Sequence, residues 1–360
     1  MKFISIFLFC FSILLTNGCD IGSLKPKAFI TQDDGIVTVL SIPEHAVIDR
    51  ISVGSHPTGT CVSPDGKKVF VTNQDSDTVS VIDAKSHKVL STFNAPHNPS
   101  ACAVGTDGNI VYVASAGGVS GTEGNNVFAF DVQTGKVVWK TSAIDGPTGI
   151  AIAKDGRTVY LTSYQMQSLF SIDAQSGEIL DYIYAGGPAD SIVVSPDGKS
   201  IYVAFHLFAG FVREYNADDF SEVTRIKVGE GPRGMDISPD GKLLCVANQG
   251  TFNPDSTVSI ISTGSKEVVK TLQVGGDFEP EFPGENLAEE PETLRKTGSG
   301  PVGVSFGPEG KYVYVTCEYT GTVSVIDTEK LEVVTSIQVG RKPYSYGRFI
   351  SPPPRPTKMP

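Results

Sequence analysis

The stretch from His56 to Ala95 constrains the fold of this chain more than any other. It holds four short apolar segments separated by three turn sequences, at 58–62, 68–72, 78–82 and 88–93. Short apolar runs punctuated by turns predict an antiparallel meander of four strands. Closely similar stretches return along the sequence, so the chain is built from an internal repeat of roughly 40 residues, the period of propellers and solenoids.

A proline marks the first strand of each copy, and seven such prolines occur: Pro57, Pro99, Pro147, Pro188, Pro232, Pro301 and Pro343. The first set of the other three strands, near 28–53, has no inner strand before it. The last inner strand, Tyr344–Ile350, has no set after it. Pairing these ends closes a ring and leaves no exposed edge at the join. We therefore predict an all-β fold, a seven-bladed β-propeller of four-stranded antiparallel blades over 28–350, closed by pairing of the N- and C-terminal strands.

Turn and strand chemistry favour the same fold. The turn SPDG, at 63–66, 195–198 and 238–241, fits a type I turn followed by a glycine at positive φ. Strands such as VFVTN at 69–73 and VYVTC at 313–317 are apolar on both faces. Sheets stacked blade against blade need such strands, because both of their faces are buried.

These motifs carry a resemblance to a known family. VFVTN, VYVTC, the SPDG turns, TVSVID at 78–83 and 322–327, and the P-x-G starts of the copies resemble the YVTN-repeat (YncE-like) β-propellers of secreted and surface proteins. The resemblance covers 28–350 and implies a seven-bladed propeller. It implies no single activity, since that superfamily includes haem- and copper-dependent reductases, amine dehydrogenase subunits, lactonase-like enzymes and plain binding proteins.

The N-terminal residues 1–18 carry Lys2 as their only charge and contain a 13-residue apolar run from Phe3 to Leu15. The run is too short to span a bilayer and is typical of a secretory signal. Its end, LTNGC, resembles a bacterial lipoprotein signal, which implies lipidation of Cys19 and a tether over 19–27. We expect a membrane-anchored lipoprotein of the cell envelope, in the outer membrane or facing the periplasm, whose lipid is its only membrane contact. Ordinary cleavage near Gly18 is the alternative.

Composition limits the partners. A net charge of −11 argues against nucleic acid as a partner. The cysteines of the predicted strands show neither CxxC spacing nor the density of a disulfide scaffold. We expect them to be buried free thiols, although one pair could bridge: Cys61, Cys102, Cys245 and Cys317.

One face of the predicted ring, here called the top face, carries the loops that precede each inner strand and those that join each second strand to the third. These loops vary in length, whereas the turns of the opposite face are short and uniform. Variable loops on a rigid scaffold usually bind, so the top face is the candidate site. An acidic insertion at 276–299 is expected as a flap or short helix there, and the proline-rich tail 351–360 as extended chain.

Three histidines, His56, His97 and His206, are predicted near the mouth of the central channel. Three imidazoles can hold a catalytic metal, although exposed loop histidines are the simpler interpretation. Asp190 replaces a threonine of sister copies at the mouth, where Arg233 is also expected. Asp236 lies within an inner strand, where we expect channel water or a backbone N–H to satisfy it. Arg341 and Lys342 occupy positions equivalent to Arg233.

Aromatic residues in the same loops could form a rim for a partner, because aromatics supply much of the energy of interfaces. They are Tyr164, Phe205, Phe208, Phe211, Phe252 and Tyr319.

The sequence contains no GxSxG, HExxH or CxxCH motif. We therefore predict a monomeric, non-catalytic binding protein that takes a protein or glycan partner on its top face and needs no metal or cofactor. The residues predicted to bind are His56, His97, Asp190, His206, Phe208, Arg233, Phe252 and Tyr319. Two alternatives stay open. One is an enzyme at the channel mouth, either a metal- or cofactor-dependent oxidoreductase or a lactonase-like hydrolase. The other is an assembly scaffold in an envelope complex.

Overall fold

The computed structural model describes residues 25–95, 97–117, 125–141, 144–206, 210–250, 256–276 and 298–352 of the 360-residue chain. Several predictions fall outside these ranges and stay predictions. They concern the signal peptide and Cys19, the tether up to residue 24, nearly all of the acidic insertion, the tail from residue 353, Phe208 and Phe252.

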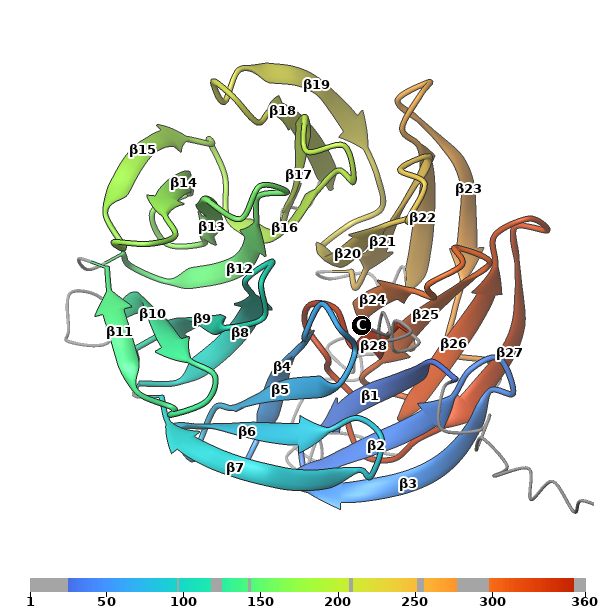
Figure 1. Ribbon diagram of the computed structural model, residues 1–360. Coiled ribbons are helices and arrows are strands. Elements are labelled where there is room, and N and C mark those ends of the chain that lie inside the picture. Colours follow the sequence, from blue (N-terminus) through green and yellow to red (C-terminus); the bar gives the residue numbers. More distant parts are fainter. Residues whose placement is uncertain are drawn as a thin grey trace, which may run out of the picture.

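Seven antiparallel sheets of four strands are arranged radially around one axis (Figure 1). Blade 1 combines the two ends of the described chain in the order β28 (Ile350–Ser351), β1 (Lys27–Gln32), β2 (Ile36–Ser41) and β3 (Ala46–Ser52). This confirms the predicted fold class, the number of blades and the closure by N- and C-terminal strands.

Each remaining blade uses four consecutive strands, the first innermost. Blade 2 is β4 (Pro57–Val62), β5 (Lys68–Asn73), β6 (Thr78–Asp83) and β7 (Lys88–Asn94); blade 3 is β8 (Pro99–Val104), β9 (Ile110–Ala116), β10 (Asn125–Asp131) and β11 (Val137–Lys140); blade 4 is β12 (Pro147–Ile152), β13 (Thr158–Ser163), β14 (Ser168–Asp173) and β15 (Ile179–Tyr184). Blade 5 is β16 (Ala189–Val194), β17 (Ser200–Phe205), β18 (Phe211–Asn216) and β19 (Glu222–Lys227); blade 6 is β20 (Pro232–Ile237), β21 (Leu243–Asn248), β22 (Thr257–Ser262) and β23 (Glu267–Gln273); blade 7 is β24 (Pro301–Phe306), β25 (Tyr312–Cys317), β26 (Thr322–Asp327) and β27 (Glu332–Gln338).

The closing strand is shorter than the sequence predicts. Only Ile350 and Ser351 form regular ladder pairs with β1, opposite Ala28 and Lys27. The preceding residues follow β1 irregularly, through the bond from the Phe29 amide to the Phe349 carbonyl (2.8 Å) and that from the Tyr344 amide to the Thr31 carbonyl (3.0 Å). The predicted strand Tyr344–Ile350 is therefore wrong in its bounds and right in its partner.

The core lies between the blades. Among the described residues, buried hydrophobic side chains form seven clusters, one at each junction between neighbouring blades. Successive residues of a strand serve opposite junctions: Phe70 packs toward blade 3, and Val69 and Val71 pack toward blade 1. This alternation explains why both faces of the second and third strands are buried. The described residues include no helix that is long and apolar enough to cross a membrane.

Two of the four strand cysteines differ from expectation. Cys61 of β4 and Cys102 of β8 form a disulfide between neighbouring inner strands, with their Cα atoms 5.7 Å apart. The default expectation of free thiols is wrong for this pair, and the alternative that one pair bridges is confirmed. Equivalent inner strands run side by side and bring distant positions of the sequence into contact. The expectation of free thiols is confirmed for Cys245 and Cys317, which are buried and free.

Candidate functional site

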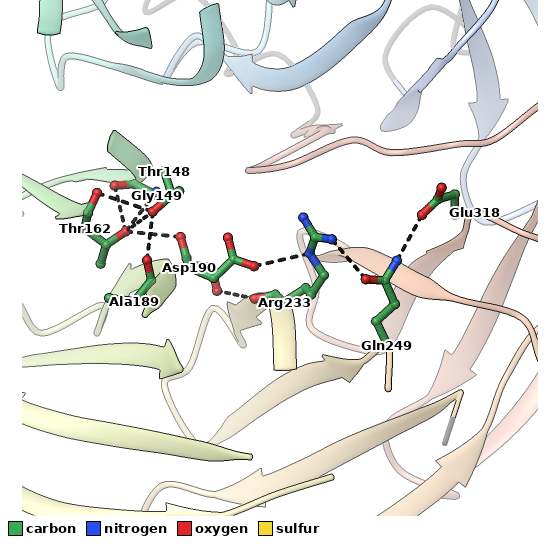
Figure 2. Close-up of polar contacts among 9 residues, drawn as sticks. Thr148, Gly149, Thr162, Ala189, Asp190, Arg233, Gln249 and Glu318 are labelled. Atoms are coloured by element: carbon green, nitrogen blue, oxygen red, sulfur yellow. Dashed lines mark hydrogen bonds and ion pairs between the residues drawn. The ribbon is translucent and has the colours of Figure 1, made fainter. Parts of the chain in front are cut away.

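A chain of hydrogen bonds crosses the top face from blade 5 to the C-terminal segment. We call its members the top cluster: Asp190, Arg233, Gln249, Glu318 and Tyr344. Asp190 and Arg233 lie at the starts of the inner strands β16 and β20, and Gln249 and Glu318 directly follow β21 and β25. Figure 2 shows the first four side chains linked in this order.

Each side chain of the top cluster is hydrogen-bonded directly to the next one. Arg233 donates from Nε to Asp190 Oδ2 (3.2 Å) and from Nη1 to Gln249 Oε1 (2.9 Å). Gln249 Nε2 donates to Glu318 Oε2 (2.9 Å), and the Tyr344 hydroxyl donates to Glu318 Oε1 (3.2 Å). The top cluster thus fixes side chains from three blades and from the closing segment in one arrangement.

The repeat explains why two charges meet here. In blades 2 and 4 the second residue of the inner strand is a threonine whose hydroxyl bonds the next inner strand, as Thr148 Oγ1 does with the Ala189 carbonyl (2.9 Å). Blades 5 and 6 carry Asp190 and Arg233 at this position. Their longer side chains reach each other instead, and the Asp190 side chain is only 11 % exposed.

The C-terminal segment brings a further aromatic side chain to the top cluster. Tyr346 is held on blade 2 by the bonds from its amide to the Thr58 carbonyl (3.1 Å) and from the Thr60 amide to its carbonyl (2.8 Å). Its ring centre is 5.4 Å from the guanidinium carbon of Arg233 on blade 6, a cation–π distance. The segment therefore links two blades that are not neighbours in the ring.

Two polar atoms beside the top cluster are buried without a hydrogen-bond partner among the described residues. They are the Tyr346 hydroxyl and Nδ1 of His206. Burial lowers the pKa of His206, and nearby Asp190 opposes that effect in part. Burial also raises the pKa of the Tyr346 hydroxyl, so the phenol keeps its proton. Both groups are thus neutral near pH 7.

Asp236 lies on the same inner strand as Arg233. Its carboxylate accepts bonds from the amides of Ile237 and of Phe306 on blade 7, both at 2.9 Å, and Arg348 Nε lies 3.5 Å away. Burial raises the pKa of Asp236, with Arg348 acting in the opposite direction. We expected channel water or a backbone N–H to satisfy this acid, and backbone N–H groups do so. These bonds join blades 6 and 7.

The three predicted histidines do not form one site. His56 lies 3.4 Å from Asp75 and packs against the ring of Tyr344, whereas His97 is an exposed loop residue and His206 lies at blade 5. The described parts of the chain contain no group of three or more His, Cys, Asp or Glu side chains placed to hold a metal ion. The hypothesis of a three-histidine metal centre is therefore wrong for these residues.

Arg341 and Lys342 lie near Asp33 of blade 1, at 3.5 and 3.8 Å from one of its carboxylate oxygens. The sequence placed both residues at positions equivalent to Arg233. Unlike Arg233, they are paired with a carboxylate that precedes β2 and not with one from an inner strand.

The predicted aromatic rim is present only in part. Tyr164 is 41 % exposed, as expected. Phe205 is fully buried, so its predicted place in an exposed loop is wrong: it ends β17, opposite Ala189, and packs between blades 4 and 5. Phe211 and Tyr319 are half-buried, and Tyr319 lies against Gly300.

Sequence reasoning found Asp190 and Arg233 and missed Gln249, Glu318, Tyr344 and Tyr346. A positional signal for two of the missed residues was present. Gln249 and Glu318 both come directly after the second strand of their blades, where His206 stands in blade 5. Comparing the copies at that position alone would have grouped them.

Comparisons with known proteins agree with this architecture. No curated protein matches the chain. A solved structure described as Kuenenia stuttgartiensis hydrazine synthase is similar in fold, with a TM-score of 0.66 and 23 % sequence identity over 80 % of this chain and 88 % of that one. The family described as outer membrane protein assembly factor BamB matches residues 33–141 and 75–277, which together make up more than half of the sequence. The chain therefore belongs to this family of β-propeller proteins.

Proposed function

We propose that this protein is a non-catalytic, lipid-anchored binding protein of the cell envelope that engages a protein or glycan partner through its top face. The observation that carries the proposal is the top cluster, in which Arg233, Gln249 and Glu318 are held in place by mutual hydrogen bonds on a closed ring. Side chains fixed before binding lose little entropy when a partner arrives. The description of the family as an outer membrane protein assembly factor favours a protein as the main partner.

Two further observations support the envelope location. The leader and Cys19 resemble a lipoprotein signal, and the repeat motifs resemble the YVTN subtype of secreted and surface propellers. The Cys61–Cys102 disulfide adds an independent argument. Such bonds persist in oxidising compartments and are rare in the reducing cytosol, so an exported chain fits the bond well.

The binding proposal is tested by capture from envelope extract with the purified full-length protein. Tyr164→Ala and Glu318→Ala each change the top face. Tyr182→Ala, which removes a 61 % exposed tyrosine from the outer strand β15, is the matched control. We expect one polypeptide or glycan, identified by mass spectrometry, to be retained by the wild type and the control and reduced at least fivefold by the top-face variants. Equal retention by all four proteins would remove the top face as the binding surface.

Lipid anchoring is tested separately by labelling cells with radioactive palmitate. We expect label in the wild-type protein and none in Cys19→Ala, with the variant released into the soluble fraction. An unlabelled wild-type protein would refute lipidation and would leave the top-face proposal intact.

A further inference from the structure

Four groups around Arg233 have hydrogen-bonding capacity that the described residues do not use. The Tyr346 hydroxyl and His206 Nδ1 are buried without partners. Arg233 uses Nε and Nη1, which leaves Nη2, and Asp190 accepts from Arg233 on Oδ2, which leaves Oδ1. Buried polar atoms without a partner are costly and rare in folded proteins, and two of the four groups, the Tyr346 hydroxyl and His206 Nδ1, are of this kind. The side chains of Arg233 and Asp190 are 29 % and 11 % exposed. The concentration of the four groups at one place indicates a ligand that would complete them.

The charges of the top cluster disfavour an ionic ligand. The Arg233 guanidinium is balanced by the Asp190 carboxylate, at 3.2 Å. Glu318 is held by two neutral donors, Gln249 and Tyr344. An anion would therefore meet no unbalanced positive charge within the cluster and would lie near two carboxylates. A cation would have to compete with Arg233 for Asp190, or displace the Gln249 and Tyr344 donors that occupy the two oxygens of Glu318. Hydrogen bonds to uncharged groups are the recognition that this arrangement allows.

The unused groups also have the right mixture of chemistry for one class of ligand. Arg233 Nη2 can only donate, Asp190 Oδ1 can only accept, and the Tyr346 hydroxyl can do both. The rings of Tyr346 and His206 stand beside them, and Tyr164 lies 6.4 Å from His206 between ring centres. A sugar ring presents neighbouring hydroxyls, each a donor and an acceptor, together with apolar C–H faces that pack on aromatic rings.

We propose that the top cluster, together with Tyr346 and His206, is a binding site for a neutral saccharide. Arg233 Nη2 donates to one ring hydroxyl, Asp190 Oδ1 accepts from its neighbour, and the Tyr346 hydroxyl completes the set. This inference rests on the proposed function only in taking the top face as the binding face, and it goes beyond it by naming the ligand class and the residues that contact it.

The test uses Tyr346→Phe, which deletes one oxygen atom. Because this hydroxyl has no partner among the described residues, its loss should not lower the melting temperature. Tyr182→Phe is the matched control, since it makes the same change on the exposed outer strand. The probes are glucose, galactose and N-acetylglucosamine, with glucuronic acid as the anionic counterpart, measured by saturation-transfer NMR and calorimetry on the full-length protein.

We expect at least one neutral probe to bind saturably to the wild type and to Tyr182→Phe, and about fivefold more weakly to Tyr346→Phe, the effect of one neutral hydrogen bond. Tighter binding of glucuronic acid than of every neutral probe would overturn the proposal. So would unchanged binding to Tyr346→Phe, or no saturable binding of any neutral probe.

The same variants separate this proposal from the proposed function. If the envelope partner is captured by wild type and no sugar binds, the saccharide site is refuted and the binding function stands. If Tyr346→Phe abolishes capture of a protein partner while no sugar binds, these residues recognise protein, and the saccharide proposal is equally refuted.

Discussion

Asp236 shows how one buried acid can join two blades. It is 4 % exposed and accepts amide hydrogens from its own strand and from Phe306 of blade 7. Asp236→Ala should lower the free energy of unfolding by about 1–3 kcal/mol, because two buried amides lose their acceptor. Arg348→Ala should cost less than about 1 kcal/mol, since its guanidinium side chain is 67 % exposed.

Urea denaturation of both variants checks this prediction. Equal losses of stability for Asp236→Ala and Arg348→Ala would show that the ion pair, and not the backbone bonds, accounts for the stabilisation.

At the scale of residues, the sequence identifies those that break the repeat. Asp190 and Arg233 stand out because sister copies carry threonine at the same position. Tyr344 and Tyr346 do not stand out, since their role depends on the irregular path of the closing segment across the ring. The Cys61–Cys102 bond was also not predictable, because it depends on the sideways register of two inner strands that no local pattern records.

At the scale of elements, the glycine of the P-x-G starts has a steric role. A Cβ atom at Gly234 of β20 would lie 2.1 Å from the carbonyl oxygen of Val302 on the neighbouring inner strand β24. Gly234→Ala should lower the free energy of unfolding by about 1–3 kcal/mol, because backbone must shift to accept the methyl group. Gly264→Ala is the control, since the nearest atom there is 4.0 Å away.

Thermal and urea unfolding of the two glycine variants test whether the loss of stability comes from the clash with the Val302 carbonyl or from replacing any glycine by alanine. A Gly234→Ala protein as stable as the Gly264→Ala protein would contradict the steric interpretation.

The bottom-face turns should make the blades sensitive to acid. The Ser238 hydroxyl and the Lys242 amide lower the pKa of Asp240 from 3.8 to about 2. Ser195 and Lys199 lower the pKa of Asp197 in the same way. A depressed folded-state pKa gives stability that is present above pH 3.8 and is lost as the pH falls toward 2.

Urea midpoints of wild type and Asp240→Asn, compared at neutral pH and at several values down to about pH 2.5, check the direction. We expect wild type to be the more stable at pH 7 and the difference to shrink on acidification. A difference that stays constant or grows would contradict the assignment.

The positions and burial of the second and third strands were the most predictable features of the elements. Second and third strands such as β5 and β6 are buried on both faces because two blades cover them, and the sequence TVSVID of β6 recurs unchanged in β26. The closing strand β28 was predicted too long, because Tyr344–Phe349 bonds partly to β1 and partly to β4 and forms no continuous ladder with either.

At the scale of the whole molecule, the ring depends on its last described residues. A chain ending after Lys342 would lose the fully buried Phe349, worth about 1.5–3 kcal/mol by burial alone, and all pairing to β1. We expect it to aggregate or fold incompletely, since the edge of β1 would be open. A chain ending after Pro352 keeps every described contact and should remain folded. Gel filtration and circular dichroism compare the two, and a compact, soluble protein ending at Lys342 would show that closure is dispensable.

The closing segment, Tyr344–Ser351, pairs with β1 and also places the ring of Tyr346 beside Arg233. Occupancy of the top cluster and integrity of the join are therefore thermodynamically linked. A ligand that binds Tyr346 only in the closed ring would, by mass action, stabilise the pairing of the closing segment with β1. The free energy of opening the ring at this join would then be greatest in the ligand-bound protein.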